Sequence, residues 1–343
     1  MRRTLAVATL LLLLLPTTAA QAAAPDTLRA AAHGAGIKIG TAVDMSALDS
    51  DPRYRDLVAA EFSTVTAENV MKWEALEPTR GTHNYEPADR LVRFARQHNQ
   101  KLRGHVLVWH SQNPAWLTEG DFSAAELRQI LREHITETVT HFKGQVWHWD
   151  VVNEIFNDDG TWRDTIWYRT LGPSFVADAF RWAHRADPAA KLYLNDYNNE
   201  GLSPKSDAYY ALVQQLKAQG VPVQGYGVQG HLATQYGVPQ TTLENLRRFE
   251  RLGLDTAFTE VDVRIPLPAD SAEVQAQAQG FTTLLQACLL ASRCVSYTLW
   301  GFTDRYNWVP GVFDGEGEAT PLTVDYERKP AYRSIRDTLR LAS

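Results

Sequence analysis

The stretch Trp149-Asp150-Val151-Val152-Asn153-Glu154 is a short apolar run that ends abruptly in a carboxylate. Thr259-Glu260-Val261-Asp262 repeats this pattern later in the chain. A buried parallel strand that delivers a side chain to the mouth of a barrel has this appearance. A glutamate at a strand end can also be a surface charge or a helix cap, so the surrounding sequence has to decide.

Short apolar runs of the same kind recur along the whole chain. Eight strands are predicted, at residues 37–43, 62–67, 101–109, 148–153, 191–195, 225–229, 255–260 and 295–300. Eight such units in roughly 320 residues, with no linker between them, predict one α/β domain, a single (β/α)8 TIM barrel. An open doubly wound sheet is the alternative, but no glycine-rich phosphate turn follows the first strand.

Between these runs the periodicity becomes helical, and the helix ends carry recognisable signals. Ser123 and Glu126 predict a capping box. Pro188 and Gly253 predict the ends of two further helices. Helices are also expected to open at two positions near the C-terminus, Ser271 and Pro330.

The composition is that of an ordinary globular protein, with 343 residues of which 44% are hydrophobic and 22% charged. The net charge is −6 and no block of like charge is long. Nucleic acid and anionic membranes are therefore not favoured as partners, and a neutral substrate fits better. Ten Trp and thirteen Tyr supply flat rings that suit both core packing and stacking on sugars.

Residues 1–24 are predicted to be a signal peptide, which leaves 25–343 as the catalytic domain. Arg2 and Arg3 precede an apolar run at 5–15, and Ala20-Gln21-Ala22 is a small-x-small cleavage site. The run is shorter than the ~18 to 20 residues that cross a bilayer. We therefore expect a secreted, extracellular protein, with the export route left open by the arginine pair.

Export would place the two cysteines in an oxidising compartment, where Cys288 and Cys294 can pair. We expect a structural disulfide. Two cysteines without a suitable histidine cluster make a zinc site an unattractive alternative.

Polar and aromatic residues follow seven of the eight predicted strands at the same relative place. These groups are Glu68-Asn69-Val70-Met71-Lys72-Trp73, His105 with Trp109-His110-Ser111-Gln112-Asn113, Asn153-Glu154, Asn195-Asp196-Tyr197-Asn198, Gln229-Gly230-His231, Glu260-Val261-Asp262 and Trp300 with Asp304-Arg305-Tyr306-Asn307-Trp308. Active sites of TIM barrels lie at this end of the strands, so the repetition predicts a functional site. Two carboxyl groups there suffice for glycoside hydrolysis. A protonated one gives a proton to the leaving oxygen, and an ionised one attacks or stabilises the sugar carbon.

Taken in order, these motifs resemble glycoside hydrolase family 10, the endo-1,4-β-xylanases, and the resemblance extends from about Ile37 to the end of the chain. It implies hydrolysis of xylan and xylo-oligosaccharides with retention of configuration. Glu154 would be the general acid/base and Glu260 the nucleophile. Retention requires the two carboxyl groups to lie ~5 to 5.5 Å apart, which strands on facing sides of a small barrel mouth allow.

The resemblance and the barrel geometry together imply roles for the other residues of the site. Asn153 would donate to the sugar 2-hydroxyl, and His231 would bind Glu260 and keep it ionised. The remaining substrate-binding residues are expected to be Glu68, Asn69, Lys72, His105 and Gln112 for hydroxyls in the glycone subsites, Trp109, Trp300 and Trp308 as aromatic floor and wall, Tyr197 on the leaving-group side, and Gln229. The other five tryptophans are expected to be core or packing residues: Trp116, Trp147, Trp162, Trp167 and Trp182.

Two local features complete the prediction. Asn153 and Glu154 would point to opposite faces under strict strand alternation, so we predict a bend or bulge at Val152-Asn153. Thr256 stands where the family commonly has an aliphatic residue, and a β-branched threonine still suits a strand.

Three functions stay open. The first is a xylanase, and the second is a cellulase or mixed-specificity relative, since glucose differs from xylose only by its C6 hydroxymethyl group. The third is a non-catalytic sugar-binding barrel, which is disfavoured because both carboxylates are present. We expect no cofactor and no catalytic metal, because two carboxylates and water complete the reaction, and we expect a monomer.

Overall fold

The computed structural model describes residues 26–343 of the chain. The predicted signal peptide lies outside the described residues. Within residues 26–343, no helix is both long enough and apolar enough to cross a membrane.

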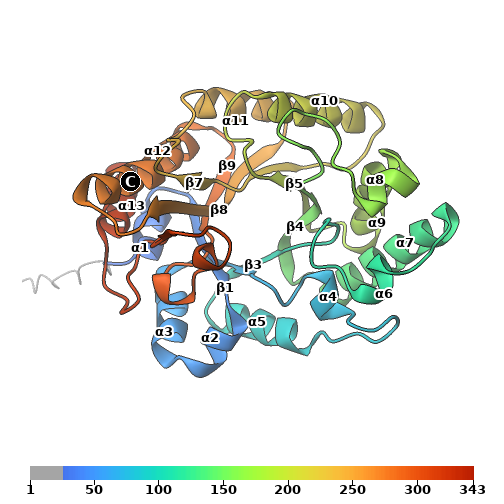
Figure 1. The fold of residues 1–343 in the computed structure, drawn as a ribbon, viewed down its shortest axis with the longest axis horizontal. Coiled ribbons are helices and arrows are strands. Elements are labelled where there is room, and N and C mark those ends of the chain that lie inside the picture. The colour runs from blue at the N-terminus through green and yellow to red at the C-terminus, as the bar shows by residue number, and fades with distance from the viewer. Residues whose placement is uncertain (1–25) are drawn as a thin grey trace, which may run out of the picture.

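Eight parallel strands close into a barrel, and this confirms the predicted fold class (Figure 1). The barrel strands are β1 Lys38–Val43, β2 Thr64–Ala67, β3 Lys101–Gly104, β4 Val146–Asn153, β5 Lys191–Asp196, β6 Gly225–Val228, β8 Asp255–Pro266 and β9 Cys294–Leu299. β9 pairs in parallel with both β8 and β1, so the sheet has no open edge in the barrel.

Helices surround the barrel on its outer side (Figure 1). They are α1 Leu28–Gly34, α2 Met45–Ser50, α3 Pro52–Glu61, α4 Trp73–Leu76, α5 Glu86–Gln97, α6 Ala115–Thr118, α7 Ala124–His141, α8 Ile166–Leu171, α9 Ser174–Ala186, α10 Pro204–Ala218, α11 Thr242–Arg251, α12 Ser271–Leu290 and α13 Pro330–Leu341, with short 3-10 turns η1 Asp304–Tyr306 and η2 Val309–Gly311. Their apolar faces pack on the strands and form one continuous core.

The predicted helix signals are confirmed. Ser123 and Glu126 form the capping box of α7. α9 ends two residues before Pro188, and α12 and α13 begin at Ser271 and Pro330. Gly253 follows α11 with φ +84°, a backbone conformation that glycine adopts without steric cost.

The structure corrects the predicted ends of two strands by several residues, β3 and β8, and adds two strands. β3 ends at Gly104, not at Trp109, because the next residues turn inward along β4, where the amide of Val108 donates to Val151 O at 3.0 Å. β8 is longer than predicted and runs on to Pro266, pairing with β7 His231–Ala233 and β10 Glu316–Gly317. Strands of two or three residues carry no periodic signal, which explains why these two were not predicted.

Four of the five tryptophans assigned to packing lie in or against the core, whereas Trp147 does not and instead stacks on the ring of the adjacent His148. Trp167 and Trp182 are buried, whereas Trp116, Trp147 and Trp162 are half-buried. Among the half-buried three, the Trp116 indole donates to the backbone oxygen of Glu77 at 3.0 Å.

Cys288 and Cys294 form the predicted disulfide, which joins the end of α12 to the start of β9. Replacing both by serine should lower the free energy of unfolding by about 2 kcal/mol. The bridge restricts the conformational entropy of the unfolded chain, and a short closed loop gives only a modest effect. Catalytic activity at 25 °C should not change, since the bridge lies at the end of β9 remote from the strand ends that carry the predicted site. Urea unfolding of the variant and of the oxidised wild type measures the difference, and equal stabilities would show that the bridge contributes nothing.

Candidate active site

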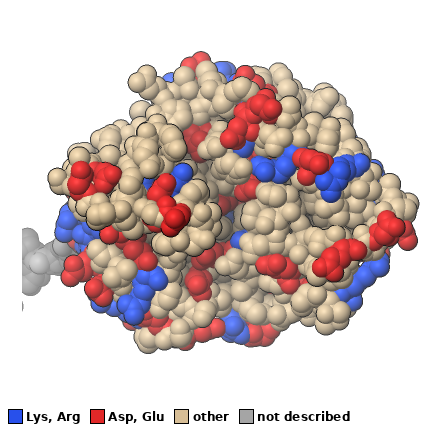
Figure 2. All heavy atoms as spheres, in the orientation of Figure 1, with Lys and Arg blue, Asp and Glu red and all other residues tan. Residues whose placement is uncertain are grey.

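A cavity of about 930 Å³ opens at the carboxyl ends of the barrel strands. Figure 2 shows it as a hollow near the centre of this face, with acidic side chains along it. All fourteen residues predicted for the site line this cavity: Glu154, Glu260, Glu68, Asn69, Lys72, His105, Trp109, Gln112, Asn153, Tyr197, Gln229, His231, Trp300 and Trp308. The barrel therefore brings together side chains from seven strand ends, as the repeated pattern predicted.

The end of β4 breaks the strand alternation so that Asn153 and Glu154 both face the cavity. The register against β5 shifts between Asp150 and Val152, and Glu154 itself has φ +58°. The predicted irregularity is present, but it flanks Val152-Asn153 on both sides and does not lie at that peptide. As a result, the Asn153 Nδ2 lies 3.2 Å from the Glu154 Oε1.

The Glu154 carboxylate is held by donors without a formal charge. The Trp109 indole donates to its Oε2 at 2.8 Å and the Gln229 amide to its Oε1 at 3.1 Å. His110, which belongs to a strand-end group but was given no role, has its Nδ1 3.6 Å from Oε2. Burial lowers the pKa of His110 even though Glu154 opposes the shift, so this imidazole is neutral at neutral pH.

The Glu260 carboxylate lies in a different electrostatic environment. The Asn195 amide donates to its Oε1 at 2.7 Å, and the His231 Nε2 donates to its Oε2 at 3.2 Å. The His105 Nδ1 lies 3.8 Å from Oε1. Burial alone would raise the pKa of Glu260, but electrostatic attraction from His105 and the hydrogen bond and charge of His231 outweigh it, and the pKa is lowered. Glu260 is therefore ionised at neutral pH.

His231 bridges two carboxylates. Its Nδ1 lies 3.0 Å from Asp262 Oδ1 while its Nε2 contacts Glu260, as the sequence predicted. Burial opposes charging of the ring, but the charge of Asp262 together with that of Glu260 raises the pKa of His231 to about 10. The Trp308 indole donates to the other oxygen of Asp262 at 2.7 Å, so Asp262 orients both predicted site residues.

Replacing His231 by asparagine should move the acid limb of the kcat/KM profile to higher pH. The imidazolium stabilises ionised Glu260, so its loss raises the pKa of Glu260, and the ionised fraction then falls at a higher pH. We expect a shift of about one pH unit or more. The measurement is the pH dependence of kcat/KM on an aryl xylobioside with an activated leaving group. The exposed His33→Asn is the control, and an unmoved acid limb would contradict the assigned electrostatic role.

A buried ion pair supports the floor of the cavity beneath Glu260. Arg103 pairs with Asp150 through two nitrogens, and the His105 Nδ1 lies 3.0 Å from the same carboxylate. His105, Asp150 and Glu260 also form the one group of described residues whose ligand atoms lie close enough together to hold a metal ion. The guanidinium of Arg103 already balances the charge of Asp150, which leaves this group little attraction for a further cation.

One arm of the cavity is a polar network around Lys72. Its Nζ donates to Asn69 Oδ1 at 2.9 Å and to Gln112 Oε1 at 2.6 Å, and it lies 5.2 Å from the ring centroid of Trp109. Burial lowers the pKa of Lys72, although the surrounding carboxylates oppose this. Burial and Asp44 raise the pKa of the neighbouring Glu68 to about 7. Glu68, Asn69, Lys72 and Gln112 are among the residues predicted to bind glycone hydroxyls.

Trp300 contributes an apolar surface next to His105 and His231. Its ring centroid lies 5.2 Å from that of His105 and 6.3 Å from that of His231, both in edge-to-face orientation. Tyr197 lines the cavity from the loop after β5. Its hydroxyl accepts a hydrogen bond from Arg163 at 2.8 Å.

Some residues of the site were not predicted. Asn195 is buried at the end of β5 and donates to both Asn153 and Glu260, at 2.8 and 2.7 Å. Gly227 makes room for it, because an added Cβ would lie 2.3 Å from the Asn195 amide oxygen. Asn195 and Asp262 belong to the strand-end groups noted in the sequence, so a polar residue inside an apolar strand was the available signal. Arg163 follows no strand directly, and no sequence signal singled it out.

Comparison with known proteins agrees with this site. The profile of "Glycosyl hydrolase family 10" matches residues 27–338. An endo-1,4-beta-xylanase of Agaricus bisporus is 44% identical over 299 residues, which cover 87% of this chain and 90% of that protein. Endo-1,4-beta-xylanase B of Thermotoga neapolitana is 39% identical, covering 91% of each chain.

The fold is similar to that of solved structures over nearly the same span. Xylanase 10B from Thermotoga petrophila RKU-1, crystallised in complex with xylobiose, superposes with a TM-score of 0.89 at 40% identity, covering 92% of this chain and 97% of that chain. The family match over most of the chain, the identity of these relatives and the shared barrel lead to one conclusion: the chain belongs to glycosyl hydrolase family 10.

Proposed function

We propose that this protein is a secreted endo-1,4-β-xylanase that hydrolyses internal β-1,4-xylosidic bonds of xylan with retention of configuration. The observation that carries the proposal is the pair Glu154 and Glu260, which line one cavity but have different hydrogen-bond partners. Glu260 is bonded by a histidine cation, while Glu154 is bonded by the neutral donors Trp109 and Gln229. Two carboxyl groups in unlike surroundings are what a nucleophile and an acid require.

In the first step, the ionised Glu260 attacks the anomeric carbon and Glu154 protonates the departing sugar oxygen. The C1–oxygen bond breaks as the ester bond to Glu260 forms. In the second step, Glu154 takes a proton from water, and the resulting hydroxide oxygen attacks C1 from the face that the leaving group vacated. Glu260 departs as a carboxylate, and the product keeps its β configuration.

Asn153 has a supporting part in this scheme. Its amide oxygen accepts from Asn195 at 2.8 Å and from Gln229 at 3.2 Å, and these bonds fix which end of the amide is the donor. The Nδ2 is thereby directed toward Glu154 and the cavity. It is suited to donate to the sugar 2-hydroxyl, a contact that strengthens in the transition state.

Xylan is the proposed substrate because the relatives and the solved structure named above are xylanases, one of them bound to xylobiose. The alternative is a cellulase or mixed-specificity enzyme, which would need space for a C6 hydroxymethyl group near Lys72, Gln112 and Trp300. The composition of residues 1–24 and the disulfide between Cys288 and Cys294 support secretion. A monomer is proposed as the working form.

Proton NMR of the anomeric products tests this proposal directly. Soluble xylan and a soluble cellulose derivative are hydrolysed side by side, and spectra are recorded before mutarotation. Early β-xylo-oligosaccharides from xylan, with little release from cellulose, are expected. An α-anomer formed first would refute retention, and β-products mainly from cellulose would refute the substrate.

A further inference from the structure

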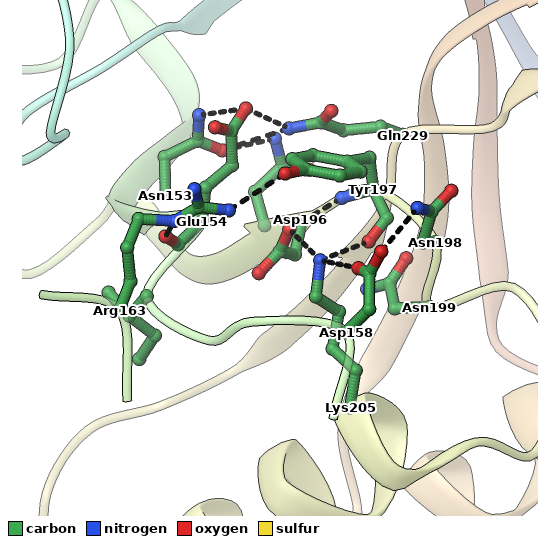
Figure 3. A network of polar contacts seen from close by, with 12 residues as sticks. Asn153, Glu154, Asp158, Arg163, Asp196, Tyr197, Asn198, Asn199, Lys205 and Gln229 are labelled. Atoms are coloured by element: carbon green, nitrogen blue, oxygen red, sulfur yellow. Dashed lines mark hydrogen bonds and ion pairs between the residues drawn. The ribbon is translucent and has the colours of Figure 1, made fainter. Parts of the chain in front are cut away.

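We infer that Arg163 is a positioning residue that holds the backbone of Glu154 and couples it to Tyr197. The inference rests on the proposed roles of Glu154 as acid/base and of Tyr197 on the leaving-group side. Arg163 comes from the segment after β4, and its guanidinium reaches two parts of the site at once (Figure 3). Its Nε donates to the carbonyl oxygen of Glu154 at 2.7 Å and one Nη donates to the Tyr197 hydroxyl at 2.8 Å.

The backbone of Glu154 needs such support. With φ +58°, this glutamate occupies the left-handed region, which a residue with a side chain adopts only when its surroundings hold it there. Three contacts do so. The Glu154 amide donates to Asn195 O at 2.9 Å, Arg163 donates to the Glu154 carbonyl, and the next amide, of Ile155, donates to the Tyr209 hydroxyl at 3.3 Å.

Arg163 is itself held by a short hairpin. The amide of Arg163 donates to Ile155 O at 2.8 Å, and the amide of Asn157 donates to Thr161 O at 2.8 Å. Gly160 at the hairpin tip has φ +82° and lies against the start of α10. A Cβ added to it would be 2.7 Å from Pro204 O. The hairpin thus fixes the backbone of Arg163, and the two hydrogen bonds of its side chain hold the guanidinium.

Tyr197 is clamped from a second direction by Lys205. The Lys205 Nζ is buried, lies 3.8 Å from the centroid of the Tyr197 ring and donates to the Tyr197 carbonyl at 3.0 Å (Figure 3). Asp158 at the hairpin tip pairs with the same Nζ at 2.9 Å. The Tyr197 hydroxyl accepts from Arg163, which leaves its own proton available for a substrate oxygen.

A second route joins the same two sites through buried groups. Lys205 contacts Asp196 Oδ1 at 3.1 Å, and the Tyr209 hydroxyl donates to Asp196 Oδ2 at 2.6 Å. Tyr209 also accepts from the amide of Ile155, which shares its peptide with the Glu154 carbonyl. A sugar that binds against Tyr197 therefore contacts a residue that is linked by hydrogen bonds to the groups that hold the backbone of Glu154. The arrangement links occupation of the leaving-group side to placement of the proton donor.

The test compares Arg163→Met with wild type on aryl β-xylobiosides of graded leaving-group ability. We expect kcat/KM to fall by about 10²-fold for poor leaving groups, the scale of a 1 Å misplacement of a catalytic group. For the dinitrophenyl substrate, which needs no protonation, we expect a loss of only a fewfold. This substrate also measures the folded, active fraction of the variant. Arg169→Met, an exposed arginine on α8 paired with Asp164, is the matched control and should match wild type throughout.

Chemical rescue separates positioning from general damage. Guanidinium ion added to Arg163→Ala should restore a measurable part of the lost kcat/KM, selectively for poor leaving groups. Equal losses for all leaving groups, or no loss, would overturn the inference. Glu154→Ala is measured on the same series. If that variant shows no leaving-group dependence, the acid/base role of Glu154 fails independently of the Arg163 result.

Discussion

Replacing Glu260 by alanine is expected to reduce kcat on xylan on the order of 10⁴-fold or more, the scale on which loss of a nucleophile acts in hydrolases. No ester can form without this carboxylate, and the neighbouring Asp150 does not replace it, because Asp150 is engaged with Arg103 and His105. Initial rates on xylan and on an aryl xylobioside should fall together, since both substrates need the same attack on C1.

Azide identifies the missing group. In Glu260→Ala, azide can occupy the vacated space and attack an activated aryl xylobioside, which would give an α-xylobiosyl azide. The exposed Glu244→Ala on α11 is the control and should retain wild-type rates. Full activity of Glu260→Ala, or a β-azide from it, would contradict the assignment of the nucleophile.

Replacing Glu154 by alanine is expected to have a large effect that depends on the leaving group. Hydrolysis of xylan should slow by about 10²- to 10⁴-fold, the usual contribution of a general acid. The kcat/KM for a dinitrophenyl xylobioside should change little, because this leaving group departs without a proton. The quantity to measure is kcat/KM across a series of aryl leaving groups, in which the slope against leaving-group pKa becomes steep in the variant.

The second step supplies an independent check on Glu154. Without its general base, the glycosyl ester on Glu260 should accumulate, and azide should accelerate turnover to give a β-xylobiosyl azide. The α-azide from Glu260→Ala and the β-azide from Glu154→Ala distinguish the two roles by stereochemistry. An α-azide from Glu154→Ala would mean that the two assignments are reversed.

Much of the fold followed from the sequence because its signals are local. Each barrel strand is an apolar run bounded by helix caps, and these patterns are written in neighbouring residues. The boundary of β3 was wrong because the apolar residues after Gly104 look like strand residues, although Leu107 and Val108 bond to β4 outside the regular ladder. β7 was not predicted because its three residues gain their pairing only from the extended β8.

The candidate site was predictable to the extent that it lies at strand ends. In a parallel barrel all carboxyl ends meet on one face, so a list of strand ends is already a list of neighbours. Arg163 is an exception, because it does not lie at a strand end. It lies in a hairpin after β4, and its side chain reaches back to the carbonyl oxygen of Glu154. Asn195 stood in one of the strand-end groups but was given no role, because its part in the site depends on the groups that it contacts in space.

The sequence by itself determined the barrel, the carboxylates Glu154 and Glu260, and the polar and aromatic side chains that line the cavity. Only the tertiary structure decided which donors meet each carboxylate. His231 is a cation because Asp262 and Glu260 both lie against it, and Glu260 has a lowered pKa because His105 and His231 outweigh its burial. The physical reason is that a pKa depends on burial and on charges within a few ångströms in space, and these distances arise only when segments far apart in the chain are packed together.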